Sequence, residues 1–225
     1  MNFLLWQWLF GVVCLVKVKA KGVTLMKYYI DITLLPDAET NLGFLWQKVF
    51  QQVHLALVDN KVGDNESAIA MSVVDYGDKT FPLGNKLRLL ASAEDSLKRL
   101  NVNRWLNRLS DYCHISSIKK VPAGIRQHAR FSRKNVKSIW KKAQRRAAHL
   151  NKPYDEVLAY LIEEAKSKEC QLPFITVESQ DTKKRAVQNV SCHFLLFIAQ
   201  DLCVKSVSGK FDCYGLSKTA TVPLF

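Results

Sequence analysis

Hydrophobic and polar positions follow two different periods along the chain. Short runs rich in β-branched and aromatic residues, typical of strands, are separated by longer segments whose apolar residues recur every three or four positions, typical of helices. Up to residue 121 the expected order is strand 27–35, helix 41–59, strand 68–76, strand 86–91, helix 92–108 capped by Ser92, and strand 113–121. This order predicts a ferredoxin-like domain, in which helices cover one face of an antiparallel sheet.

The rest of the chain alternates less regularly. It is expected to contain a helix at 133–150 with Ser132 as its N-cap, a second helix that begins near Pro153, and strands at 172–177, 191–199, 202–207 and 210–214. The pattern therefore predicts an α+β fold with two domains. Residues 26–121 form the ferredoxin-like domain, and residues 122–225 form a C-terminal domain with a basic helix and a small antiparallel sheet.

Residues 1–25 differ from the rest of the chain. An apolar run, shorter than the ~20 residues of a membrane-spanning helix, is followed by Lys17, Lys19 and Lys21. The segment lacks both the basic start and the small-residue cleavage site of a signal peptide. We expect a leader that is not part of the native protein and arises from a misplaced start codon. A signal peptide or a short anchor is the alternative interpretation.

Charge changes the picture most between residues 112 and 154. The chain has a formal net charge of +13, and this stretch holds twelve of its 33 Lys and Arg residues without a single Asp or Glu. Such closely spaced cations repel one another unless a polyanion neutralises them, so we expect a nucleic-acid partner rather than a membrane. The alternative is a solvated helix face that only favours solubility.

The six cysteines indicate no metal site, because they show neither a CxxC pair nor the His spacing of a zinc site. We expect free thiols in a cytoplasmic protein without a cofactor. A bond between Cys203 and Cys213 across a hairpin is the alternative. Among the histidines, His54 lies at the edge of the apolar stripe of helix 41–59, where packing is the more common role and acid–base chemistry the alternative.

Several separated runs resemble one known family. They are YYIDITLLPD at 28–37, VHLALV at 53–58, LRLLASAED at 87–95, LPFITVESQ at 172–180, FLLFI at 194–198, CYGLSK at 213–218 and VPLF at 222–225. In this order they resemble the type I-F CRISPR repeat endoribonuclease, which cuts CRISPR transcripts at a stem-loop. The likeness extends from residue 26 to residue 225.

The resemblance implies a role for particular residues. It places the catalytic histidine at His54, the active-site serine at Ser179 and the active-site tyrosine at Tyr214. Phe194 falls where an aromatic ring stacks beneath the stem, and Arg130 where an arginine reads a base. The further RNA-binding residues expected are Ser132, which stands where the family has a Gln, together with Arg133, Lys134, Lys137, Lys141, Lys142, Arg145, Arg146 and Gln180.

The function implied is a metal-independent, hairpin-specific endoribonuclease. The 2′-OH of the RNA would attack the adjacent phosphorus and leave a 2′,3′-cyclic phosphate, with His54 as the general base. The enzyme would stay on its product within a type I-F surveillance complex. The alternative is a non-catalytic subunit that only binds the RNA hairpin. A membrane-associated basic protein is a third interpretation that depends on residues 1–25 alone.

Overall fold

The structure is a computed structural model that describes residues 25–35, 37–134, 139–167, 172–178 and 193–225. Helices and antiparallel strands are mixed along the chain, which confirms the α+β fold class. Residues 1–24 lie outside the described residues, so the interpretation of the leader remains a prediction. Within the described ranges, no helix combines the length and the apolar character needed to cross a membrane.

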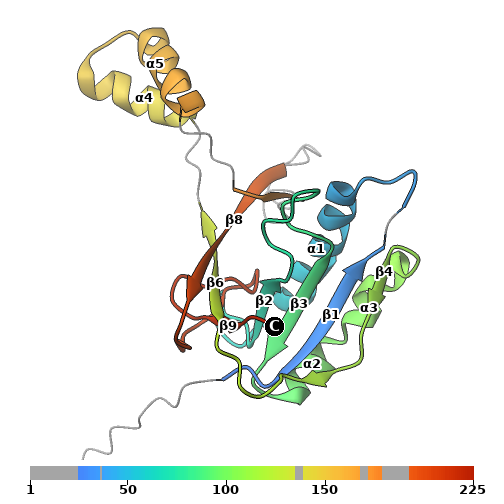
Figure 1. The fold of residues 1–225 in the computed structure, drawn as a ribbon. Coiled ribbons are helices and arrows are strands. Elements are labelled where there is room, and N and C mark those ends of the chain that lie inside the picture. The colour runs from blue at the N-terminus through green and yellow to red at the C-terminus, as the bar shows by residue number, and fades with distance from the viewer. Residues whose placement is uncertain (1–24, 36, 135–138, 168–171, 179–192) are drawn as a thin grey trace, which may run out of the picture.

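The first sheet is built from the N-terminal half of the chain. Its strands are β1 (Tyr28–Leu34), β2 (Ile69–Val73), β3 (Lys86–Ala91), β4 (Cys113–Ile115) and β5 (Lys119–Lys120). The order is β2-β3-β1-β4, with β5 also paired to β1, and every pairing is antiparallel. Figure 1 shows the helices α1 (Leu42–Asp59) and α2 (Glu94–Leu100) behind this sheet.

The second sheet follows from the C-terminal half. It contains β6 (His128–Lys134), β7 (Phe174–Glu178), β8 (His193–Cys203) and β9 (Val222–Pro223), in the order β7-β8-β6-β9. Between β6 and β7 the chain forms α4 (Ile139–Leu150) and α5 (Tyr154–Ser167). These two helices pack on each other around Ala143, Ala147, Val157 and Leu161, and they stand apart from both sheets in Figure 1.

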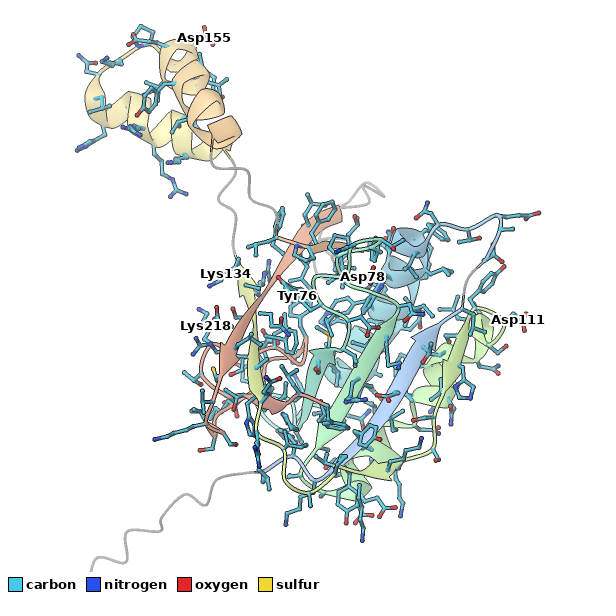
Figure 2. The ribbon with its side chains drawn as sticks, viewed as in Figure 1. Tyr76, Asp78, Asp111, Lys134, Asp155 and Lys218 are labelled. Carbon is cyan, nitrogen blue, oxygen red and sulfur yellow. The ribbon has the colours of Figure 1, made fainter. Side chains whose placement is uncertain are left out.

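One hydrophobic cluster joins the two sheets. It includes Trp46 and Phe50 of α1 together with Phe131 of β6 and Leu196 of β8. Tyr76, labelled in Figure 2, adds a polar link, because its hydroxyl donates to the carbonyl oxygen of Ile198 at 2.8 Å. The predicted domain boundary near residue 121 remains a prediction, since a shared core does not by itself divide or unite the two units.

The expected helix at 92–108 is wrong in two respects. It is divided into α2, α3 (Val102–Leu106) and a 3₁₀ turn, η1 (Asn107–Leu109), and the break lies at Asn101 with φ +45°. Asparagine accepts this left-handed conformation more readily than most residues, and the bend lets both Leu100 and Val102 reach the core. The N-cap is Ala93 rather than Ser92, and it provides no side-chain hydrogen bond.

The expected helix at 133–150 is also wrong at its start. Residues 128–134 form β6, and α4 is described from Ile139 onward, so Ser132 is a strand residue and not an N-cap. Every residue of β6 pairs with β8, for example Ser132 with Ala199. These long-range backbone hydrogen bonds outweigh the helical spacing of the local sequence, which is a weak determinant on its own.

Strands near the C-terminus also differ from expectation. The strand expected at 191–199 extends as β8 to Cys203, and residues 204–214 form no named strand, with Phe211 making a single bridge to Ser67. The strand expected at 113–121 is split into β4 and β5. Cys113, Cys203 and Cys213 are free thiols, so the Cys203–Cys213 bond is not formed.

Candidate active site and RNA interface

His54 lies on α1, at the boundary between the buried face of the helix and solvent. Its Nδ1 is 2.9 Å from the carbonyl oxygen of Cys213. Since a carbonyl can only accept, Nδ1 must carry the proton, and Nε2 is then the nitrogen with a lone pair. Burial lowers the pKa of His54 below its ordinary value of 6.5, so the imidazole is neutral at neutral pH and able to take up a proton.

The carbonyl that holds His54 belongs to a tight turn that begins at Asp212. The Oδ1 of Asp212 accepts hydrogen bonds from the backbone N–H groups of Tyr214 at 2.9 Å and Leu216 at 3.0 Å. This is the arrangement by which an aspartate closes a turn with its own side chain. The turn therefore fixes both the Cys213 carbonyl and the Tyr214 ring relative to α1.

Gly215 docks this turn on the first sheet. Its φ is +72°, and its carbonyl oxygen accepts the N–H of Met71 on β2 at 2.8 Å. A Cβ at Gly215 would come within 2.8 Å of the Met71 Cβ and 2.9 Å of the Met71 nitrogen. Only glycine combines this backbone conformation with so close an approach to the strand.

The ring of Tyr214 lies parallel to the imidazole of His54. The centroids of these two rings are 4.2 Å apart, with 4° between their planes. The ring of Phe50, on α1, is also parallel to that of Tyr214, with 6.3 Å between the centroids. Burial raises the pKa of Tyr214, so the phenol keeps its proton. Stacking and the Cys213 hydrogen bond together determine the plane and the tautomer of His54.

Arg133 supplies a positive charge next to this stack. Its guanidinium carbon is 5.1 Å from the ring centroid of Phe194 and 5.6 Å from that of Tyr214. The nearby carboxyl of Asp212 is half-buried, and this burial raises its pKa, while Arg133 opposes that shift. A histidine with an accepting nitrogen beside a cation and an aromatic ring suits an anionic substrate with flat groups, such as a phosphodiester of a nucleic acid.

Gln51 connects α1 to the end of β7. Its Oε1 accepts the N–H of Glu178 at 3.1 Å, and its Nε2 donates to the Glu178 carbonyl oxygen at 3.4 Å. The chain thus leaves β7 close to the helical turn that precedes His54. Ser179 and Gln180 come next in the sequence but lie outside the described residues, so their roles remain predictions.

Comparisons with known proteins identify the family of the chain. The family model described as "CRISPR-associated protein (Cas_Csy4)" matches residues 29–225. The chain belongs to the Csy4 family of CRISPR-associated proteins. It is 34% identical over 201 residues to the "CRISPR-associated endonuclease Cas6/Csy4" of Pseudomonas aeruginosa (strain UCBPP-PA14), covering 89% of this chain and 100% of that relative. The chain is 31% identical to the protein of the same name from Escherichia coli (strain UTI89 / UPEC), again over 201 residues that cover 89% of this chain and 100% of that relative.

Membership in the Csy4 family confirms the resemblance found in the sequence, while the role of each residue remains a prediction. The structure brings His54, Tyr214, Arg133 and Phe194 together. It places Arg130 in a cross-strand pair with Asp201, whose Oδ2 is 3.2 Å from Nε and 3.1 Å from Nη2. Arg130, the expected base reader, therefore already donates two hydrogen bonds to Asp201.

The other expected RNA-binding residues of this Csy4-family chain are distributed unevenly. Ser132 is only 4% exposed, and its hydroxyl has no hydrogen-bond partner among the described residues, so it offers nothing to RNA as folded. Lys134 is exposed at the end of β6 nearest the helix pair (Figure 2). Lys142, Arg145 and Arg146 are exposed on α4. Lys137 and the side chain of Lys141 lie outside the described residues.

Sequence reasoning missed two residues that shape the site. Asp212 precedes Cys213, Tyr214 and Gly215, and an aspartate three residues before a glycine is a recognisable turn signal. Gln51 lies three residues before His54 and is therefore its neighbour on the helix surface, but its uncharged amide does not by itself indicate a role in catalysis. Its partner in β7 is 127 residues away, and no local pattern predicts that contact.

Proposed function

We propose that this Csy4-family chain is a metal-independent endoribonuclease that cuts CRISPR repeat RNA at the base of a stem-loop. The observation that carries the proposal is the arrangement of His54, whose Nδ1 is held by the Cys213 carbonyl and whose ring stacks on Tyr214 beside Arg133. The names of the two relatives, both endonucleases, support cleavage rather than binding alone.

The proposed reaction uses a nucleophile that RNA itself provides. His54 Nε2 accepts the proton of the 2′-OH, and this oxygen forms a bond to the adjacent phosphorus. The bond from phosphorus to the 5′-oxygen of the next nucleotide breaks, and that oxygen takes up a proton from water, while His54 later returns its own proton to the solvent. The products are a 2′,3′-cyclic phosphate and a 5′-OH. Arg133 stabilises the negative charge that develops on the phosphoryl oxygens, and Ser179 is expected to hold the ribose.

The proposed substrate is recognised mainly through its backbone. An A-form stem has a deep, narrow major groove that side chains rarely read, so cations along α4 are suited to phosphate contacts. Lys142, Arg145 and Arg146 are the exposed members of that set, with Lys134 at the end of β6 and with Lys137 and Lys141 expected beside them. Phe194 would stack beneath the lowest base pair, and Arg130 would read a guanine edge after leaving Asp201.

The proposal extends to the fate of the product. We propose that the chain keeps the cleaved hairpin and carries it into a type I-F surveillance complex in the cytoplasm, because phosphate contacts along the stem are unchanged by the cut. We also propose a ferredoxin-like N-terminal unit, which the β-α-β-β-α-β order and the strand order β2-β3-β1-β4 support.

The deciding experiment uses a cognate repeat hairpin in two forms. The all-RNA hairpin should be cut in the presence of EDTA and should yield a 2′,3′-cyclic phosphate on the upstream fragment. The same hairpin with one 2′-deoxy sugar at the scissile position should bind but remain intact. Cleavage of the deoxy form would mean that water is the nucleophile. Binding of both forms without any product would identify a hairpin-binding subunit instead.

A further inference from the structure

A second basic surface begins at Gln51, one helical turn before His54 on α1. It is a groove of about 530 Å³ between α1 and the segment of α3 and η1, which we call the α1–α3 groove. Its lining residues are Lys48, Gln51 and Gln52 of α1, Arg104 and Trp105 of α3, Asn107, Arg108 and Leu109 of η1, and Glu178 at the end of β7. The expected RNA-binding residues include none of these.

The lining of the α1–α3 groove is strongly cationic. Lys48, Arg104 and Arg108 are all exposed, and none of them pairs with a carboxylate among the residues that the structure describes. Glu178 is the one acidic residue of the lining, so three cations face one carboxylate side chain. Cations that are not neutralised within the chain concentrate anions in a concave site.

Trp105 in the lining indicates which class of anion the groove binds. Trp105 is half-buried, with part of its ring against the hydrophobic core and part in the groove. An aromatic ring among cations is the combination that binds single-stranded nucleic acid, because bases stack on the ring while the cations follow the phosphates. The bases of a single strand are free to stack on such a ring, whereas those of an A-form duplex are already paired and stacked on one another.

Contacts between side chains connect this groove to the proposed point of cleavage. Phe194 and Tyr214 flank Arg133, and Tyr214 stacks on His54. Gln51 stands one helical turn before His54 and holds Glu178, so it lies both beside the active site and in the groove. His54 is therefore linked to Arg133 and Phe194 through Tyr214, and to the α1–α3 groove through Gln51. The strand that continues past the reacting phosphate is the one downstream of the cut.

We propose that the α1–α3 groove binds the single-stranded RNA immediately downstream of the scissile phosphate. This inference rests on the proposed function, because it needs the cut to occur at His54. Interactions with the downstream strand strengthen binding of the uncut transcript and end when the leaving fragment departs. The stem contacts are not affected.

The test measures binding of three RNAs that carry a 2′-deoxy sugar at the scissile position. One ends shortly after that position, one has a single-stranded 3′ extension, and one has an equal 5′ extension. The 3′ extension should tighten binding to the unchanged chain. The variant Arg104→Ala/Arg108→Ala should lose this gain, about tenfold in affinity, and its log–log salt slope should fall by about 1.4 for two phosphates of a single strand.

A matched variant provides the control. Lys79→Ala/Arg99→Ala also removes one charge at each of two exposed positions, but these residues lie outside the groove and should leave the gain unchanged. Thermal unfolding of both variants checks the fold. The proposal is overturned if the 3′ extension gives no gain, if only the 5′ extension does, or if the control variant loses the gain equally. Failure to cut the short all-RNA hairpin would instead refute the proposed function, whatever the extensions do.

Discussion

Nδ1 of His54 is committed to the Cys213 carbonyl, which leaves Nε2 for the proposed proton transfer. Replacement of His54 by Ala should therefore slow cleavage by about 10²–10⁴-fold, the usual contribution of a positioned base. Affinity for the hairpin should change little, because His54 is not part of the basic surface. Single-turnover cleavage and equilibrium binding measure the two effects separately. His114→Ala, an exposed histidine on β4, is the control and should cleave normally.

The negative charge of Asp212 should affect how the cleavage rate depends on pH. Burial lowers the pKa of His54, whereas the Cys213 carbonyl and the carboxylate of Asp212 raise it. Asp212→Asn keeps an oxygen that can accept from Tyr214 and Leu216 but removes the charge that stabilises the imidazolium. The pKa of His54 should fall further, so the acidic midpoint of the cleavage rate should move to lower pH.

The matched control for this prediction is Asp111→Asn, an exposed position far along the chain from the turn. Its pH profile should coincide with that of the unchanged chain. A midpoint that stays in place or rises in Asp212→Asn would show that Asp212 acts only through the geometry of the turn. Asp212→Ala, which removes the acceptor as well, should lower the maximal rate in addition to shifting the profile.

At the scale of elements, α4 should account for much of the salt dependence of hairpin binding. Lys142 and Arg145 are exposed and three residues apart, so they share one side of the helix. Their joint replacement by Ala should lower the log–log salt slope by roughly 0.7–0.9 for each phosphate that the variant no longer neutralises. Fluorescence titration of the hairpin at several salt concentrations measures this slope. An unchanged slope, or an equal decrease in Lys79→Ala/Arg99→Ala, would place the stem elsewhere.

The elements differ in how far local sequence determines them. Strand β3 and helix α1 were predicted closely, because β-branched runs, an apolar stripe and the Asn41 cap are local signals. Strand β6 was missed, because its pairing with β8 depends on residues about 70 positions away, such as Asp201 opposite Arg130. The same limit applies to the site. The sequence indicated His54 and Tyr214, but not the Gln51–Glu178 contact.

At the scale of the whole molecule, the active-site turn joins two sheets that are distant in sequence. The turn belongs to the C-terminal half of the chain, yet the Gly215 carbonyl accepts a hydrogen bond from Met71 of the first sheet. The Cys213 carbonyl likewise accepts one from His54 of α1. The shared hydrophobic cluster keeps these halves in register. The geometry of the candidate site therefore depends on contacts between the two halves of the chain, and it should be sensitive to changes that separate them.

Two glycines of positive φ allow this dependence to be tested. Gly215 has φ +72° and Gly77 has φ +86°, so alanine introduces backbone strain of about 1–2 kcal/mol at either position. A Cβ at Gly77 meets nothing within 4 Å, whereas at Gly215 it meets Met71 at 2.8 Å. Gly215→Ala should therefore lower the free energy of unfolding by a further 1–3 kcal/mol or so, the usual cost of overpacking.

The cleavage rates of Gly215→Ala and Gly77→Ala should differ more clearly than their free energies of unfolding. In Gly215→Ala the turn must move away from β2, which shifts the Cys213 carbonyl and the Tyr214 ring from His54 and should reduce the cleavage rate even where the protein is fully folded. Gly77→Ala should cleave normally at the same temperature. Denaturant unfolding and single-turnover cleavage of both variants provide the comparison. Equal cleavage rates would show that His54 keeps its geometry without the docked turn, and the dependence on sheet contact would then be wrong.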